Sequence, residues 1–320
     1  MPIVVNSNAS ATTASFNLSR ANDALRKSLG RLSSGNRINN PADDAGGLAV
    51  AYKLNSKANR TTAILQNSQN ALSYLQVQDS GLQNAGKIVD RMSELRVMSQ
   101  DITKNTQDIE NYSKEFVELQ SQLNQISKEK FNGISLFANS AVTAVGSLET
   151  STASFGSLSY NTASRTLITH DSGVSTSGSI KLNVVNFQFM LSIGNLSSGA
   201  ATGSAADLGN IDGANAGTGI SSAGFISDIT EVNVSQFTNI IERIADMRAE
   251  NGAEQNRVLN SIDLLQTNLS NIEAAHGRIM DTDIALESTR FARHNILVQA
   301  SAAMTAQANQ LTNVALQLLG

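Results

Sequence analysis

The chain of 320 residues contains no cysteine, no tryptophan and only two prolines. The absence of cysteine excludes a disulfide framework, a thiol nucleophile and a cysteine-ligated metal site. It also suits a protein that works outside the cell, where no redox system protects a thiol. Charged residues make up 16% of the chain and the net charge is −4, so nothing in the composition indicates nucleic-acid binding.

The chain also lacks a secretory signal and a long apolar run. Residues 1–6 have no basic segment, and their apolar stretch is too short for a signal peptide, so export would use a route without a cleaved signal. Residues 295–320 are free of charge, yet they contain seven amide side chains that would be costly in lipid. This segment therefore favours a helix–helix interface, and we expect no contact with a membrane.

Both ends of the chain carry stripes with a seven-residue period. The C-terminal stripe consists of Leu297, Ser301, Met304, Ala308, Leu311, Ala315 and Leu318. The N-terminal stripe consists of Ala14, Leu18, Ala21, Leu25, Ser28 and Leu32. This period is typical of helices that pack along one face against a partner helix. Two such helices at the chain ends predict a protein that joins copies of itself.

Long helices are expected on both sides of a different middle region. The helical segments are 9–33, 41–103, 109–126, 237–279 and 295–320. Asn40 and Pro41 fit the N-cap and first position of the second helix, with Asp43 and Asp44 in its first turn. The pair Asn132-Gly133 predicts a turn after the third helix.

The middle region reads as strands and loops. Residues 166–169 and 179–193 are expected strands, and the apolar alternation changes phase at Val184-Val185, which favours a bulge or two stacked strands. Residues 192–224 are rich in Ala, Gly, Ser, Thr and Asn and predict a loop-rich segment. The fold class is therefore mainly α: coiled-coil-like bundles built from both chain ends, with a β-hairpin and a small β-rich module from the middle.

Several short motifs resemble those of the bacterial flagellins. The N-terminal ones are RLSSG at 31–35, RIN at 37–39, DDAGGLAV at 43–50, and FNG at 131–133 with Leu136. The C-terminal ones are RIMDTD at 278–283, QA at 299–300 and AQANQ at 306–310. The departures are small: Gly46 stands where the family usually has Ala, and the chain ends in Leu318-Leu319-Gly320 rather than in a basic residue. The resemblance covers about 140 residues at the start and 90 at the end.

The resemblance implies a three-part layout. Residues 1–40 with 283–320 would form an inner-core helical domain, and 41–175 with 232–282 a helical bundle with a β-hairpin. Residues 176–231 would form a variable, exposed module. The implied function is that of a secreted, extracellular subunit of the flagellar filament for swimming motility, exported unfolded by a type III apparatus. The implied partners are other copies of itself, an export chaperone, the filament cap and the hook–filament junction proteins.

The expected assembly interface lies on the two terminal stripes, at Leu18, Leu25, Leu32, Leu297, Met304, Leu311 and Leu318. The C-terminal stripe has four large apolar side chains for 26 residues. These are too few to offset the conformational entropy lost when the segment is ordered. We therefore expect both terminal helices to be disordered in the free subunit and to fold when neighbouring copies surround them.

Residues 90–97 resemble the stretch that the flagellin-sensing Toll-like receptor reads in many family members. Arg91, Glu94 and Leu95 match, and Glu115 is a candidate for the acidic residue on the neighbouring helix, whereas Arg96 departs from the usual Ala. A plain solvated helix face, with Leu95 buried between subunits, explains the same residues equally well. Both interpretations stay open on the sequence alone.

Catalytic and cofactor chemistry have little support in the sequence. His170, His276 and His294 lie far apart without a His-Glu-x-x-His run, so we expect neither a metal site nor an enzyme. No cofactor is expected. Ser and Thr residues of 138–230 fit O-glycosylation sites and plain turn residues equally well. The alternative function is a hook–filament junction protein, which shares helical ends but usually matches the terminal motifs poorly.

Overall fold

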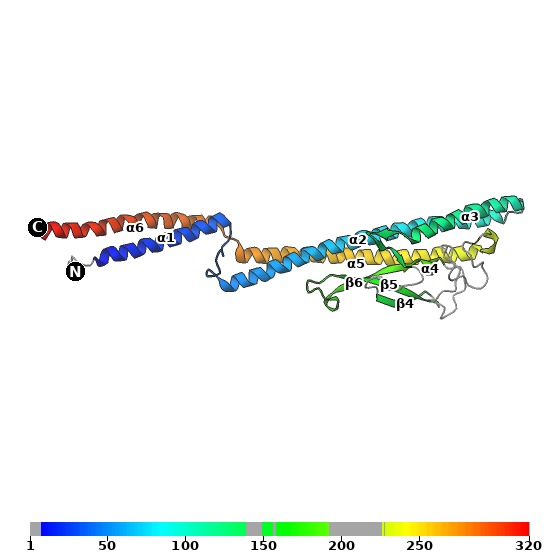
Figure 1. The fold of residues 1–320 in the computed structure, drawn as a ribbon, viewed down its shortest axis with the longest axis horizontal. Coiled ribbons are helices and arrows are strands. Elements are labelled where there is room, and N and C mark those ends of the chain that lie inside the picture. Colours follow the sequence, from blue (N-terminus) through cyan, green and yellow to red (C-terminus); the bar gives the residue numbers. More distant parts are fainter. Residues whose placement is uncertain (1–7, 139–148, 156–157, 192–225, 227, 320) are drawn as a thin grey trace. The chain divides into compact units, whose positions relative to one another are not determined.

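A computed structural model describes residues 8–138, 149–155, 158–191, 226 and 228–319 (Figure 1). The chain forms two compact units, of which the first, the terminal unit, combines Met1–Asn59 with Asn268–Gly320. The second, the central unit, comprises Arg60–Thr267. Two long helices, α2 (Ala45–Ser99) and α5 (Val234–Met280), contribute residues to both units. Residues 192–224, for which the sequence predicts a loop-rich segment, lie outside the described part of the chain.

The terminal unit is built on α1 (Ala9–Ser34) and α6 (Ile284–Leu319), which run antiparallel beside each other (Figure 1). The Asn8 side chain caps α1 by accepting from the Ala11 N–H, and Gly35 ends the helix with a φ of 72°. The Asn8 side-chain amide also donates to the carbonyl of Ala308 at 2.8 Å. The expected pairing of the two chain ends is thus confirmed.

The RLSSG–RIN motif meets the RIMDTD motif in a short clamp. Asn36 and Asp281 form an isolated antiparallel β-bridge. The Thr282 N–H donates to the Gly35 carbonyl at 2.9 Å, and the Arg37 N–H donates to the Met280 carbonyl at 2.6 Å. The guanidinium of Arg37 adds a bond of 2.8 Å to the Ile279 carbonyl. The two motifs therefore tie the α1–α2 connection to the α5–α6 connection.

Helix α2 begins later than the sequence indicates. Asn40 does not cap it: its carbonyl accepts from the Asp43 N–H at 2.9 Å, closing a separate turn over residues 40–43. Asp44 stands immediately before α2, where its carboxylate accepts from the Gly47 N–H at 2.8 Å. The start expected at Pro41 was wrong because the Asn-Pro signal serves that turn instead.

The helical part of the central unit packs α2, α3 (Thr106–Ser127) and α5 around one apolar core. A capping box on Asn105 and Asp108 starts α3. The core includes the edge-to-face pair of Phe116 and Phe237, whose ring centroids lie 6.2 Å apart. Unlike the terminal unit, this unit therefore has a conventional hydrophobic core.

Six strands occur in the described ranges of the central unit. β1 (Lys130–Phe131) and β2 (Ile134–Ser135) form the expected hairpin, with Asn132 and Gly133 at φ of 49° and 79°. The second sheet has the order β3-β6-β5-β4. Its strands are β3 (Phe137–Ala138), β4 (Glu149–Phe155), β5 (Leu158–Ile168) and β6 (Ser179–Asn186). Short helical segments are η1 (Ser175–Ser177), η2 (Ile229–Glu231) and α4 (Phe187–Met190).

The phase change at Val184-Val185 has a different cause from the one expected. β6 is antiparallel to β5 as far as Val184, and it pairs with β3 in parallel at Val185 and Asn186. Val184 belongs to a small cluster with Ala138 and Ala163, whereas Val185 faces the main core. The strand expected over 179–193 ends at Asn186, because a helical turn, α4, follows it. The fold class, mainly α with a β-hairpin and a small sheet, is confirmed.

Candidate self-assembly interface

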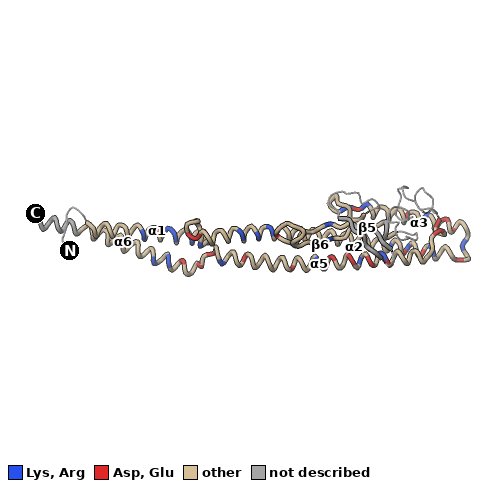
Figure 2. The backbone as a smooth tube through the Cα atoms, turned by 90° about the horizontal axis from the view of Figure 1, so that it is seen from below, with Lys and Arg blue, Asp and Glu red and all other residues tan. Residues whose placement is uncertain are grey.

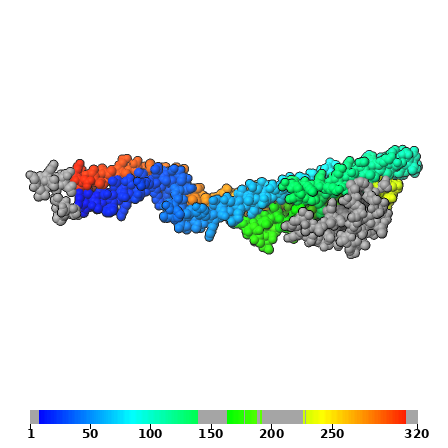
Figure 3. Space-filling model, in the orientation of Figure 1, coloured from blue at the N-terminus to red at the C-terminus, as the bar shows by residue number. Residues whose placement is uncertain are grey.

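The terminal helices use one face of each to pair with one another (Figure 3). On α1 this face is the expected stripe, whose members are all at least partly buried. On α6 it consists of Glu287, Phe291, His294, Val298, Ser301, Thr305 and Ala308. These residues also follow steps of four and three, but only Ser301 and Ala308 belong to the expected stripe. The pairing face is therefore shifted from the one that the apolar residues indicate.

Leu297 and Met304 lie at the margin of this pairing face of α6, at 44% and 65% exposure. Neither belongs to the set of α6 residues that are buried or partly buried. The backbone of α6 reaches Leu311 and Leu318, whose side chains lie outside the described part of the structure. No charged residue follows Arg293 in the chain, as the tan end of α6 in Figure 2 shows as far as the described residues extend.

Further large apolar side chains of the terminal unit are also exposed. They are Phe16, Leu29, Val50, Tyr52, Ile284, Leu286 and Ile296. Helix α1 shows how little the pair buries, since Ser28 is its one buried residue in 26. An apolar surface of this extent on a monomer indicates a surface that a partner covers.

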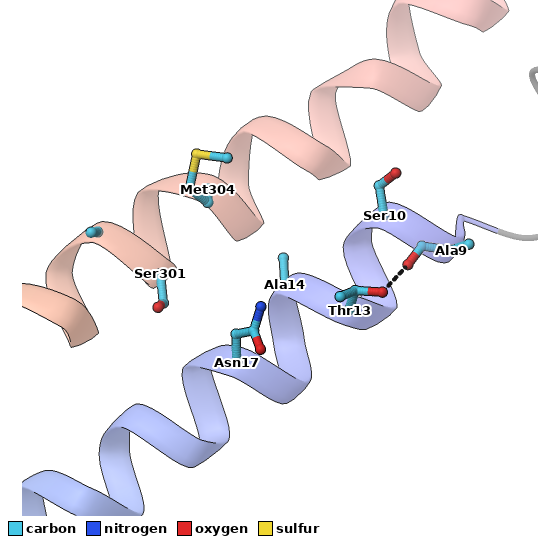
Figure 4. A pocket seen from close by; sticks show the side chains of 8 residues that line it. Ala9, Ser10, Thr13, Ala14, Asn17, Ser301 and Met304 are labelled. Atoms are coloured by element: carbon cyan, nitrogen blue, oxygen red, sulfur yellow. Dashed lines mark hydrogen bonds between the residues drawn. The ribbon is translucent and has the colours of Figure 1, made fainter. Parts of the chain in front are cut away.

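A groove of about 530 Å³ lies between α1 and α6 near the start of α1 (Figure 4). Small side chains line it, and Met304 is the largest of them. The lining residues are Ala9, Ser10, Thr13, Ala14, Asn17, Ala300, Ser301 and Met304. Because the walls are mostly small and apolar, the groove can accept a side chain from another helix.

A buried carboxylate fixes the other end of the helix pair. The Glu287 side chain is 4% exposed and lies 3.3 Å from the Arg290 guanidinium and 4.0 Å from that of Arg31. Burial alone would raise its pKa, but hydrogen bonds from Ser28 and Arg290 and the positive charges of Arg31 and Arg290 outweigh burial and lower it. The ionised form of Glu287 therefore holds α6 against α1.

The candidate receptor residues divide into two groups. The Arg91 guanidinium lies 2.9 Å from Glu115 and 3.0 Å from Glu94, and all three side chains are exposed. Leu95 is 0% exposed and belongs to the main core of the central unit. Of the two interpretations left open for Leu95, a surface contact does not fit, because this position of α2 is buried within the subunit. Three charged residues on α2 and α3 remain as a surface site.

Reasoning from the sequence missed Glu287 and the clamp. The predicted stripe consists of uncharged residues and begins at Leu297, so it does not include a carboxylate. A stripe that continues backward from Ser301 at steps of three and four passes through Val298, His294, Phe291 and Glu287. The clamp has no periodic signal, since its hydrogen bonds run mainly between backbone groups.

The arrangement offers contact surfaces rather than reactive groups. No cluster of three or more potential metal ligands occurs among the described residues. No helix in the described ranges is long and apolar enough to span a membrane.

Two family models match the chain and settle its family. The bacterial flagellin N-terminal helical region matches residues 5–142, and the bacterial flagellin C-terminal helical region matches residues 234–319. The chain belongs to the bacterial flagellin family. It is thus a subunit of the extracellular flagellar filament, the structure that drives swimming.

Similar proteins match over nearly their full length. Flagellin of Bacillus subtilis is 30% identical over 98% of this chain and 99% of its own. The flagellar filament 33 kDa core protein of Treponema phagedenis is 29% identical over 99% of this chain and all of its own. The 41 kDa core protein of Borreliella burgdorferi is also 29% identical, over 99% of this chain and all of its own. The flagellin match therefore includes the middle region as well as the helical ends.

Proposed function

We propose that this flagellin polymerises through apolar residues of its terminal helices. They are the exposed Leu297 and Met304 of α6 with the exposed residues beside them, the partly buried Leu18, Leu25 and Leu32 of α1, and Leu311 and Leu318. The observation that carries the proposal is the exposure of Leu297 and Met304 on a helix end that has no charge. Identical helices can pack along such a face without like-charge repulsion. A surface repeated by a rotation that does not close gives a helical polymer.

Folding of the terminal unit is coupled to this assembly. Isolated helices and helix pairs gain most of their stability from tertiary burial, and α1 buries one residue of 26. Each exposed Phe, Leu or Met that a neighbour covers fully would contribute roughly 1.5–3 kcal/mol. The terminal helices would therefore be disordered in the free subunit, which also fits export in an unfolded form.

The proposal is tested with purified protein under salting-out conditions. Full-length chain should form filaments and gain helical circular dichroism as it polymerises, whereas a chain ending at Arg293 should do neither. Met304→Glu should raise the critical concentration at least tenfold, because it places a charge in the interface. Met304→Leu, which conserves volume, should leave it within about twofold. Equal critical concentrations for the Glu and Leu variants would contradict the assignment of this face.

The partners of export and growth are also part of the proposal. The uncovered terminal helices suit an export chaperone before assembly, and the filament cap and the junction proteins at the filament ends. We propose that the protein is structural and works without a cofactor or catalysis. O-linked glycans on Ser or Thr of 138–230 would add mass, so the intact mass of filament-derived protein decides between modified and unmodified residues.

We further propose that the exposed triad of Arg91, Glu94 and Glu115 is the part of this chain that an innate flagellin receptor would contact. What supports it is the shared surface of α2 and α3 on which the three side chains lie. Arg91→Ala should reduce receptor activation by purified subunit. Lys114→Ala, which breaks another exposed pair with Glu110, is the matched control. Equal signals from the wild type and Arg91→Ala would remove the triad from consideration.

A further inference from the structure

At Asn183, the edge of strand β6 that faces away from β5 is bonded to helix side chains. β3 pairs with β6 only at Val185 and Asn186. Before that point, the Asn183 N–H donates to both carboxylate oxygens of Glu254 on α5, at 2.9 and 3.1 Å. The Asn183 carbonyl accepts from the Gln78 amide on α2 at 3.3 Å. Side chains of the two helices thus take the place of a neighbouring strand.

A buried chain of amides fixes these helices to each other. The side-chain amide of Asn251 donates to the side-chain oxygen of Gln78 at 2.7 Å. The side-chain amide of Gln255 donates to the side-chain oxygen of Asn251 at 2.6 Å. Gln78 is fully buried and also donates to the Leu136 carbonyl at 2.9 Å. The sheet is therefore attached to α2 and α5 by a polar network as well as by apolar packing.

Glu254 is the one member of this network that can change its charge. Its described hydrogen bonds come from a single backbone N–H, which is little compensation for a partly buried carboxylate. The side-chain oxygen of Asn183 is buried without a hydrogen-bond partner among the described residues. A neutral carboxyl group has an O–H to donate, whereas a carboxylate can only accept. The residue whose N–H bonds to Glu254 thus also carries a buried side-chain acceptor without a partner among the described residues.

The charged groups around Glu254 do not neutralise it. On α5, Glu250 repels the carboxylate and Arg257 attracts it. Tyr74 on α2 interacts with Glu254 and with Arg165 of β5, and burial raises the pKa of its hydroxyl group. Burial raises the pKa of Glu254 to about 7, and the Glu250 charge adds to the rise, against the Asn183 N–H and Arg257.

We propose that Glu254 is a proton-operated latch, which holds the β6 edge on α5 more tightly when its carboxyl group is neutral than when it is ionised. The latch would make the attachment of the small sheet sensitive to pH near neutrality. It goes beyond polymerisation, because it lies wholly in the central unit and operates within one chain.

The direction of the effect follows from linkage. A carboxyl group whose pKa is higher in the closed state than in the open state stabilises the closed state below the open-state pKa. That stabilisation disappears as pH rises through the closed-state pKa. With a closed-state value of about 7 and the ordinary value of 4.5 when open, the open fraction should rise about tenfold between about pH 6 and pH 8.

Amide hydrogen exchange of residues 179–186 tests the latch in the full-length subunit under non-polymerising conditions. After correction for intrinsic exchange rates, wild type should open about tenfold more at the higher pH. Glu254→Gln keeps the size of a neutral carboxyl and should lose the pH dependence, to within twofold. Glu250→Gln, which removes an exposed charge one helical turn away, should keep most of it.

Three results would each overturn the proposal. The first is pH-independent opening in wild type, and the second is the same tenfold rise in Glu254→Gln. The third is a direct carbon-13 titration of the Glu254 carboxyl group that shows a midpoint near the ordinary glutamate value. Neither measurement depends on filament formation, so the latch and the assembly interface can fail separately.

Discussion

Replacing Leu95 by alanine should destabilise the folded subunit rather than remove a surface contact. Leu95 is fully buried in the core that α2, α3 and α5 share. The substitution deletes three carbon atoms, worth about 0.8 kcal/mol each in transfer free energy. Because a packed core closes only in part around the space, a cavity term adds to this loss. We expect the free energy of unfolding to fall by about 3–5 kcal/mol.

Arg91→Ala provides the contrast, one helical turn away on the same helix. Its guanidinium bonds to Glu94 and Glu115, and all three side chains are exposed. Exposed ion pairs typically contribute less than about 1 kcal/mol. A loss of receptor signal in Leu95→Ala would therefore report unfolding, while the same loss in Arg91→Ala would report a contact.

Urea unfolding followed by circular dichroism measures the free energy of unfolding of both variants and of wild type. In thermal unfolding, a change of 1 kcal/mol shifts the Tm of a unit of this size by roughly 2–4 °C. Leu95→Ala should therefore melt at least about 6 °C lower than wild type. If Leu95→Ala unfolded within about 0.5 kcal/mol of wild type, the assignment of this position to the core would be refuted.

Four further substitutions test other parts of the structure. Gly81→Ala should destabilise the subunit by about 1–3 kcal/mol in thermal unfolding, because the added Cβ would lie 2.8 Å from the Phe137 ring. Gly252→Ala should instead stabilise the subunit by about 0.5–1 kcal/mol, because the added Cβ would meet no atom within 4 Å and alanine favours the helix. Asn105→Ala removes the capping box of α3 and should cost about 1 kcal/mol in the same assay. The lowered pKa of Glu287 predicts that its stabilisation is present above the ordinary carboxyl pKa and is lost on acidification. Filaments should therefore depolymerise in acid, as light scattering would show, and Glu287→Gln filaments should be weaker at neutral pH and less sensitive to acid.

The long helices were predictable because their signals are local and repeated. Apolar spacing over 22 to 55 residues identified α1, α2, α3, α5 and α6, with errors mainly at the ends. The start of α2 failed because Asn40 has two competing uses, as a helix cap and as the first residue of a turn, and both satisfy its side chain. The local sequence does not show which of the two uses Asn40 has. The use depends on the path of the chain just before it, which the clamp at residues 35–37 holds in place.

The strands were harder, because their patterns depend on which partner lies on each side. Val184 and Val185 are both buried, one against the small cluster and one against the main core. A single strand with one buried face would alternate, so two adjacent buried residues suggest an irregularity. Here the cause is a change of strand partner, from β5 to β3, which no local pattern reveals.

The terminal helices show why a heptad pattern identifies an interacting helix without identifying its partner. On α6, Leu297 and Met304 belong to one set, and His294, Val298 and Thr305 belong to a second set with the same period. Leu297 and Met304 each stand one residue before a member of the second set, Val298 and Thr305. Apolar content favours the first set, yet the structure pairs the second set with α1. Glu287 decides the phase, because its carboxylate meets Ser28 and Arg31 only when its own face is turned to α1. The more apolar set is then left outward, where other copies can cover it. In a subunit that must both close on itself and polymerise, we therefore expect the stronger apolar stripe to make the intermolecular contact.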